Sequence, residues 1–203
     1  MHDKVARLQD WLGQGSINIF GRPYAGKDTQ GETLADLFGA ELLGGGEILR
    51  NSVIPSEVRR IMDAGDLIPT ADFIRIVLPY LSDEKFANKP LILSAVGRWQ
   101  GEEEGVLQAT QAAGHPIKAV IFLNTNEALV RQRREQGIGQ DRGYRADDAA
   151  DTFEKRLTEF REKTLPVIEF YRQNDLLIEI DGSPKPPAVT ESILDALLLR
   201  AQL

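Results

Sequence analysis

The nine residues 21–29, which read Gly-Arg-Pro-Tyr-Ala-Gly-Lys-Asp-Thr, constrain the fold more than any other segment of this chain. They follow the apolar run at 16–20 and lead into a helical pattern. A glycine, four residues and then Gly-Lys is the spacing of a phosphate-binding loop, in which backbone N–H groups and a helix N-terminus face an anion. Gly21 and Gly26 permit close backbone approaches, and Lys27 can reach the β- and γ-phosphates of a nucleotide. The segment therefore predicts nucleotide binding, with an ordinary strand-to-helix turn as the alternative.

The loop departs from the usual pattern directly after the lysine. A Ser or Thr whose hydroxyl binds Mg²⁺ is usual there, whereas this chain has Asp28 and places Thr29 one residue later. A carboxylate beside phosphates repels them unless a cation lies between. We therefore expect Asp28 to bind a metal ion, mostly through bridging water molecules. A favourable negative charge in the first helical turn is the alternative. We expect a nucleotide to contact the loop at Gly21, Tyr24, Ala25, Gly26, Lys27, Asp28 and Thr29.

The composition excludes several classes of function. A chain of 203 residues, 42% hydrophobic and 27% charged, is typical of one soluble globular domain. Its net charge of −7 argues against a nucleic-acid-binding surface. Cysteine is absent, which excludes disulfides and thiolate catalysis, and His2 and His115 are too few for a histidine metal cluster. Without a membrane-spanning run or a signal-peptide core, we expect a cytoplasmic monomer with no nucleic-acid or membrane partner.

Apolar periodicity divides the chain into alternating strands and helices. Strands are predicted at 16–20, 42–43, 91–93, 118–123 and 176–180. Helices are predicted at 3–13, 27–38, 46–52, 55–64, 70–82, 101–113, 127–136, 146–173 (with a kink at Pro166) and 187–202. Strands that alternate with helices favour parallel pairing through right-handed crossovers. We therefore predict a single α/β domain of three layers with about five parallel strands, which spans 1–203 and includes a short N-terminal helix within 1–15 packed on its edge.

Four further segments carry arginines and other residues suited to a phosphate or a base. They are Gly-Gly-Gly-Glu-Ile-Leu-Arg at 44–50, Met-Asp-Ala-Gly-Asp-Leu-Ile-Pro at 62–69, Leu-Ile-Leu-Ser-Ala-Val-Gly-Arg at 91–98, and Arg-Ala-Asp-Asp at 145–148 with Arg156 eleven residues after the first arginine. Together with the loop at 21–29, these segments resemble the adenylate kinase family of nucleoside monophosphate kinases over about 16–180. The resemblance implies a P-loop NTPase-type parallel sheet with two small insertions, an acceptor-binding lobe at 44–72 and a short lid at 137–145.

The resemblance also implies which residues bind the acceptor monophosphate. Arg50 and Arg98 take the places of arginines that bind its phosphate. The alternative for Arg50 is a position on a polar, exposed helix face with no role in binding. Ser94 stands where the family has an aspartate that orders water around Mg²⁺. Glu102 lies near the sequence position at which adenine-specific members have a glutamine. Because a carboxylate accepts hydrogen bonds but cannot donate them, a preference for adenine as the acceptor base does not follow. The implied acceptor-binding residues are Gly45, Arg50, Gly65, Asp66, Leu67, Ile68, Arg98 and Glu102.

For the donor and the lid, the resemblance implies further arginines. Arg145 and Arg156 would reach the phosphates in transit, so that the catalytic set is Lys27, Arg98, Arg145 and Arg156. Three arginines at 131, 133 and 134 compete for the place that stacks on the ATP base; we choose Arg133, with Arg142 as the lid arginine, and a solvated charged face as the alternative.

The resemblance implies an ATP-dependent phosphotransferase that uses Mg²⁺ to transfer the γ-phosphoryl group of ATP to a nucleoside monophosphate, with AMP as the default acceptor. Two other functions stay open at this point. One is a P-loop kinase that acts on another small molecule or a deoxynucleotide. The other is a catalytically weak nucleotide-binding regulator, which Asp28 and Ser94 suggest because both depart from the family pattern.

Overall fold

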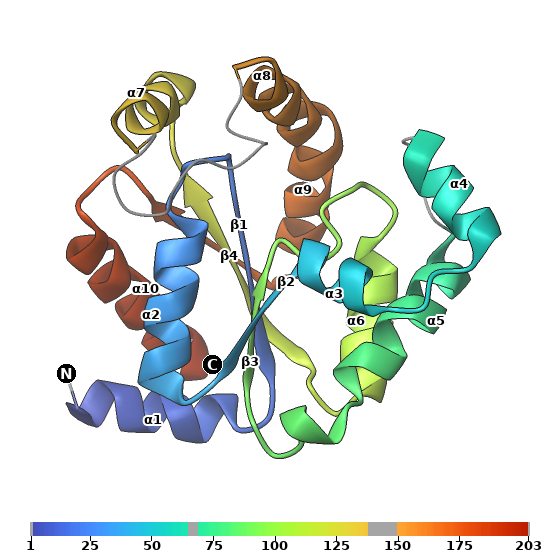
Figure 1. Ribbon diagram of the computed structural model, residues 1–203. Coiled ribbons are helices and arrows are strands. Elements are labelled where there is room, and N and C mark those ends of the chain that lie inside the picture. Colours follow the sequence, from blue (N-terminus) through green and yellow to red (C-terminus); the bar gives the residue numbers. More distant parts are fainter. Residues whose placement is uncertain (1, 65–68, 138–149, 203) are drawn as a thin grey trace.

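The computed structural model describes residues 2–64, 69–137 and 150–202, and a five-stranded parallel sheet lies at its centre (Figure 1). Every strand pair in the sheet is parallel, in the order β2-β3-β1-β4-β5. The strands are β1 (Ser16–Gly21), β2 (Glu41–Gly44), β3 (Leu91–Ser94), β4 (Ile117–Asn124) and β5 (Leu177–Asp181). The predicted strands and their parallel pairing are therefore confirmed.

Helices cover both faces of the sheet because its central strands are apolar on both sides. In β1, Ile17 and Ile19 pack on one face and Phe20 packs on the other. The first face is covered by α1 (His2–Leu12), α2 (Lys27–Phe38) and α10 (Pro186–Ala201), and the second by α5 (Thr70–Leu81), α6 (Glu103–Ala112) and α9 (Leu165–Gln173) (Figure 1). The three predicted layers are thus present, with one apolar core on each face of the sheet.

The N-terminal helix α1 is attached to the first face by burial and by charge. Leu8 and Leu12 are fully buried in the core of that face. Lys4 forms ion pairs with Glu191 at 2.5 Å and with Asp195 at 2.6 Å, both on α10. The first and last helices therefore lie side by side at the edge of the domain, as the sequence predicts for α1. None of the described helices is both long and apolar enough to cross a bilayer.

The remaining helical elements lie mostly near the carboxyl ends of the strands, whereas the short turn at 84–86 lies at their amino ends, just before β3 (Figure 1). They are α3 (Gly45–Asn51), α4 (Ser56–Ala64), the 3-10 turn η1 (Glu84–Phe86), α7 (Glu127–Gly137), α8 (Ala150–Glu159) and the π-helical turn η3 (Phe160–Thr164). The helical stretch predicted at 146–173 is confirmed over its described part, 150–173, and the irregularity expected at Pro166 takes the form of the π-helical turn η3 between α8 and α9. Pro166 has no N–H to bond to the preceding turn, and the chain widens so that the Leu165 N–H bonds to the Phe160 carbonyl.

A buried asparagine in the central strand holds the loop that follows β3. The Asn18 Nδ2 donates to the Val96 carbonyl at 2.8 Å, and its Oδ1 accepts from the Val96 N–H at 3.3 Å. The neighbouring Ala95 N–H donates to the Ile19 carbonyl at 3.0 Å. These bonds hold Ala95 at a φ of 51°, a left-handed conformation that is strained for a residue with a side chain. The position of this loop is therefore set by β1.

Replacing Asn18 with alanine should lower the free energy of unfolding by about 2–3 kcal/mol, because the N–H and carbonyl of Val96 lose their buried partner. Urea unfolding followed by circular dichroism measures the change. The control is Ser192→Ala on α10, where the hydroxyl is exposed and bonds only to a carbonyl of its own helix; we expect a change within about 0.5 kcal/mol there. Equal losses in the two variants would contradict the role given to Asn18.

Candidate functional site

A cavity of about 1030 Å³ opens at the carboxyl ends of the strands, where ligands bind in open parallel sheets. Its lining comes from the loop between β1 and α2, the loop after β3, the helical elements α3, α5, α7, α8 and η3, and the loop between β5 and α10. This volume lies at the upper end of the usual range for a single small-molecule pocket, so the cavity is large enough for two ligands side by side.

The loop at 21–29 has the geometry of an anion cradle. Gly26 is the N-cap of α2 and has a φ of 99°, which only glycine adopts without strain. Having no side chain, it offers the amide groups of the first turn no partner, so they stay available to a ligand at the positive end of the helix. Gly21 ends β1, where a Cβ would lie 3.1 Å from the Leu123 carbonyl oxygen. The two glycines thus serve the purposes that the sequence predicts.

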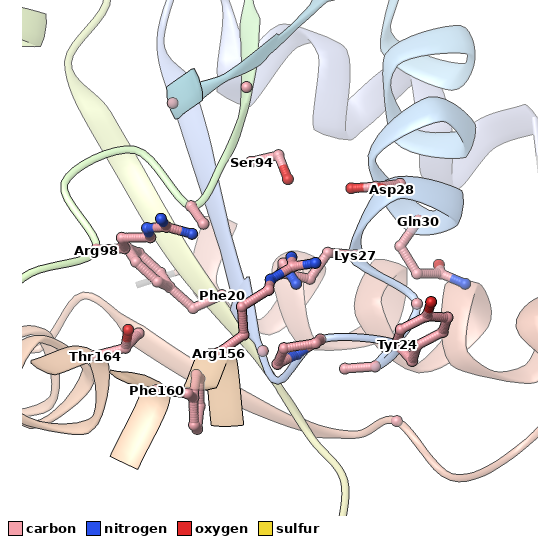
Figure 2. A pocket seen from close by; sticks show the side chains of 18 of the residues that line it. Phe20, Tyr24, Lys27, Asp28, Gln30, Ser94, Arg98, Arg156, Phe160 and Thr164 are labelled. Atoms are coloured by element: carbon pink, nitrogen blue, oxygen red, sulfur yellow. The ribbon is translucent and has the colours of Figure 1, made fainter. Parts of the chain in front are cut away.

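Three cationic side chains meet beside this cradle. The pKa of Lys27 is lowered to about 8, mainly by burial, with the charges of Arg156 and Arg98 acting in the same direction and the charge of Asp28 opposing them. Such an effect requires the two arginines to lie near the ammonium group, and Figure 2 shows all three side chains around one central space. The Lys27 Nζ donates to the Arg22 carbonyl at 3.2 Å within its own loop. The structure therefore brings together three of the predicted catalytic residues from α2, α8 and the loop after β3.

Asp28 and Ser94 lie on opposite sides of the space above Lys27. Figure 2 shows the Asp28 carboxylate and the Ser94 hydroxyl directed toward each other, one from the first turn of α2 and the other from the end of β3. Both residues line the main cavity and also a smaller one of about 340 Å³ beside it. Two oxygen-bearing side chains therefore face each other beside the three cations Lys27, Arg98 and Arg156, which together form the cationic centre of the cavity.

Tyr24 links the cradle to the helix that carries Arg156. It has a φ of 61°, a conformation that is uncommon outside glycine. Its ring packs edge-to-face on Phe153 of α8, with ring centroids 5.6 Å apart, and joins a cluster that contains Val130 and Leu157. The sequence placed Tyr24 in the loop but did not indicate this contact, because it depends on how α8 packs.

Arg133 bridges two segments of the cavity wall. Its guanidinium donates to the Ala25 carbonyl at 3.3 Å, and to the carbonyls of Gly182 at 2.8 Å and Ser183 at 3.0 Å. Arg131 instead pairs with two carboxylates on the helices α7 and α8, and the Arg134 guanidinium lies over the Phe153 ring at 5.2 Å. Of the three competing arginines, Arg133 is the one that lines the cavity.

The structure describes only some of the residues that the sequence predicts for binding the acceptor monophosphate. Gly45 and Glu102 line the cavity, and so do the loop residues predicted for ATP. Arg50 lies in α3. The other predicted residues lie outside the described parts of the chain: Gly65, Asp66, Leu67, Ile68, Arg142 and Arg145.

Sequence reasoning missed several residues that line the cavity. An apolar wall is formed by Ile48, Phe73, Val77 and Val96, and η3 adds Phe160 and Thr164. The segment 182–186 also lines the cavity, beside the cradle, where the Gln30 Nε2 donates to the Pro186 carbonyl at 3.0 Å. Its position after the last strand is a signal that could have been used, because loops at the carboxyl ends of parallel strands line such sites. The apolar wall gave no signal, because its residues are indistinguishable from core residues in the sequence.

A parallel sheet that ends in a phosphate cradle, with arginines reaching in from two other elements, defines a P-loop nucleotide kinase. Comparison with known proteins narrows the class. A family model described as "Adenylate kinase" matches residues 19–176, so this chain belongs to the adenylate kinase family. It is therefore an ATP-dependent phosphotransferase of the nucleoside monophosphate kinase class, and the resemblance that the sequence motifs indicate is confirmed.

Curated relatives carry the same description and span nearly the same length. The chain is 32% identical over 184 residues to the "Adenylate kinase" of Agrobacterium fabrum, an alignment that covers 86% of this chain and 93% of the relative. It is 33% identical over 184 residues to the "Adenylate kinase" of a Nocardioides species, covering 88% and 95%. The "Adenylate kinase" of Deinococcus radiodurans is 30% identical over 190 residues, covering 89% and 95%.

If Tyr24 anchors the cradle through Phe153, a double-mutant cycle should detect the pair. Tyr24→Leu, Phe153→Leu and the double variant keep a Cβ at residue 24, so the backbone strain there is the same in each. We expect a coupling free energy of about 0.5–1.5 kcal/mol from urea unfolding. The matched control pairs Tyr24→Leu with Phe86→Leu, because Phe86 belongs to the core on the second face of the sheet and not to the cluster around Tyr24. A coupling no larger than in that control would show that the ring contact does not stabilise the loop.

Proposed function

We propose that this chain transfers the γ-phosphoryl group of ATP to AMP and forms two molecules of ADP. The observation that carries this proposal is the convergence of Lys27, Arg98 and Arg156 on one space at the N-terminus of α2. Phosphoryl transfer needs little covalent chemistry from a protein and depends on positioning and on neutralising charge. Cations from three elements around a helix N-terminus supply both.

ATP is proposed to bind with its phosphates in the cradle and its base toward the loop at 182–186. The amide groups of the first turn of α2 and the Lys27 ammonium would hold the β- and γ-phosphates. Because Lys27 has a pKa of about 8, it is mostly charged at neutral pH, and a bound polyanion favours the charged form further. The proposed ATP contacts are Gly21, Tyr24, Ala25, Gly26, Lys27, Asp28, Thr29, Arg133 and, from the lid, Arg142.

The acceptor is proposed to bind along the opposite wall, with its phosphate between Arg98 and the cradle and its base toward Glu102. Gly45 and Glu102 both line the cavity. The roles that the resemblance implies for Arg50 and for Gly65, Asp66, Leu67 and Ile68 complete this half of the proposal. An arginine fork suits a phosphate because it gives parallel charge-assisted hydrogen bonds.

In the transfer itself, an oxygen of the acceptor phosphate forms a bond to the γ-phosphorus while the bond to the β,γ-bridging oxygen breaks. The attacking oxygen is already an anion, so no general base is required. Lys27, Arg98 and Arg156, together with Arg145 from the lid, are proposed to offset the charge on the transferred group. Closure of the lid over both substrates would exclude water and so prevent hydrolysis of ATP.

The residues at the edge of the cationic centre fit a magnesium ion. The Asp28 carboxylate and the Ser94 hydroxyl face each other beside the cradle (Figure 2), and Mg²⁺ prefers oxygen ligands. The described residues contain no group of three His, Cys or acidic side chains that could hold a metal ion, which suits an ion held largely by substrate phosphates and water. When bound, Mg²⁺ supplies positive charge to the β- and γ-phosphates.

The proposed reaction is tested by following ADP formation from ATP and AMP in the presence of Mg²⁺. Lys27→Met should lower kcat by about 100-fold to 1,000-fold, because the phosphates lose a preorganised cation. Circular dichroism checks that the variant keeps its fold. Absence of turnover with every nucleoside monophosphate would overturn the proposal, and retention of ATP binding in that case would favour a nucleotide-binding regulator instead.

The role proposed for Asp28 predicts opposite effects with and without metal. In Asp28→Asn, the Mg²⁺ concentration for half-maximal rate should rise by about tenfold or more, because a group that orders the ion's water is lost. Without Mg²⁺, the same variant should bind ATP more tightly than the wild type, because a negative charge beside the phosphates is removed. Kinetic Mg²⁺ titration and calorimetry in a chelator measure the two effects.

The matched control for that experiment is Asp36→Asn, an exposed carboxylate near the other end of the same helix. It should leave both the Mg²⁺ dependence and metal-free ATP binding unchanged. If Asp28→Asn behaves like this control, Asp28 does not serve the metal and acts only as a favourable charge in the first helical turn.

A further inference from the structure

The loop that carries Arg98 joins β3 to α6 and has no regular structure of its own. Every residue at 95–102 is described, and none of them belongs to a helix or strand. The Arg98 side chain is exposed, so close packing does not determine its direction. The bonds from Asn18 to Val96 hold the first part of the loop. The place of Arg98 in the cavity therefore depends on what holds the second part.

The second part of the loop is attached to the π-helical turn η3. The Gln100 N–H donates to the Lys163 carbonyl at 2.9 Å. The Lys163 Nζ lies over the ring of Trp99, 4.0 Å from its centroid. Tryptophan is the aromatic side chain that attracts a cation most strongly. The backbone of Arg98 thus lies between two attachments, one at Val96 and one at the pair formed by Trp99 and Lys163.

The Trp99 ring makes this contact with its face, while its N–H group gains nothing. Trp99 lines the cavity, and its Nε1 is buried with no hydrogen-bond partner among the described residues. A buried donor without a partner destabilises a fold, whereas the face of the same ring meets a positive charge. The interaction with Lys163 is therefore the polar contact that this indole makes through its ring.

The turn η3 is also attached to the phosphate cradle. The Arg22 guanidinium lies over the ring of Phe160, the first residue of η3, at 5.1 Å from its centroid. Arg22 belongs to the cradle loop, and its Nη1 donates to the Thr125 carbonyl at 2.6 Å. Its own carbonyl accepts from the Lys27 Nζ. A continuous set of contacts therefore runs from the cradle through η3 to the loop that carries Arg98.

These contacts join the two places where the proposed function puts phosphate groups. The cradle would hold the phosphates of ATP, and Arg98 would hold the phosphate of the acceptor. Phosphoryl transfer requires the attacking oxygen and the γ-phosphorus to be close and in line, and a small misplacement lowers the rate strongly. A contact that sets the distance between the two sites can therefore affect the reaction without touching a substrate.

We propose that Lys163 is a positioning residue for phosphoryl transfer, which holds Trp99, and with it Arg98, at a set distance from the cradle. This inference rests on the proposed function. Lys163 is not one of the described residues that line the cavity, so it acts through the loop and not on the substrates. Loss of its charge should impair the acceptor side more than the ATP side, because the cradle keeps its own contacts.

The test compares Lys163→Met, which removes the charge and keeps a side chain of similar length, with Lys163→Arg. In Lys163→Met, kcat/KM for AMP should fall by about tenfold, through a higher KM for AMP and a lower kcat, while KM for ATP changes by less than about twofold. Lys163→Arg should keep most of the wild-type activity, because a guanidinium group also stacks on an aromatic face. Rates of ADP formation at varied AMP and varied ATP measure these effects.

A double-mutant cycle separates positioning from a direct effect of charge. If Lys163 acts through Trp99, the combination of Lys163→Met with Trp99→Leu should be no less active than Trp99→Leu alone. Losses that multiply would show that the ammonium acts on the substrates by itself, and would overturn the proposal. Trp99→Phe keeps an aromatic face and should lose less activity than Trp99→Leu; it replaces Trp99→Leu in the cycle if circular dichroism shows that the leucine variant does not fold.

The matched control is Lys155→Met, which removes an exposed lysine from α8 and should keep the wild-type KM for both substrates. Equal losses in Lys155→Met and Lys163→Met, or a loss confined to KM for ATP, would overturn the role of Lys163 and leave the proposed function intact. Absence of turnover with every nucleoside monophosphate in the wild type would instead overturn the proposed function, and this role with it.

The contact itself has a readout that does not depend on turnover. The chain has two tryptophans, so Trp11→Phe leaves Trp99 as the single source of indole fluorescence. Because indole emission responds to a charge beside the ring, Lys163→Met in this background should shift the emission, and Lys155→Met should not. An emission spectrum that Lys163→Met leaves unchanged would show that the ammonium does not lie over the ring, and would overturn the proposal.

Discussion

The structure depends on the junction between the buried strand β1 and the N-terminus of α2. That N-terminus is the positive end of the helix dipole, and its N-cap is a glycine. Because β1 is fully buried in the middle of a parallel sheet, its carboxyl end and Gly26 have a fixed position. The amide groups of α2 then face a cavity into which the loops of the neighbouring strands also open. A phosphate placed there meets backbone dipoles that need no rearrangement.

Gathering positive charge around this cradle has a structural cost. Lys27, Arg98 and Arg156 repel one another, which contributes to the lowered pKa of the lysine. The backbone carries strain as well, since Tyr24 and Ala95 both adopt left-handed conformations without being glycine. Packing offsets these costs: the Tyr24 ring rests on Phe153, and the bonds from β1 hold the loop at Ala95. Strain and repulsion thus concentrate where the substrates are proposed to bind.

The sequence was sufficient for the elements whose signal is local. The strands are apolar runs, and the cradle is a spacing of glycines and a lysine, so both could be predicted without tertiary information. The convergence of Arg98 and Arg156 on Lys27 followed from the resemblance and not from periodicity. The π-helical turn η3 could not be predicted, because a proline indicates a break but not how the chain adjusts to it. The bridge made by Arg133 depends on segments 49 residues or more apart.

Two carboxyl groups near the proposed phosphate-binding sites show why residue type alone does not determine the charge state of a side chain. Asp28 is exposed at the helix N-terminus, where water and a cation can reach its charge. Glu102 is buried against apolar side chains, and the cheaper response to burial is to keep a proton. The same functional group therefore meets solvent at one position and, at the other, a buried environment that raises its pKa. For Glu102, the sequence predicted a carboxylate that only accepts, because the burial that raises its pKa depends on the tertiary packing around α6.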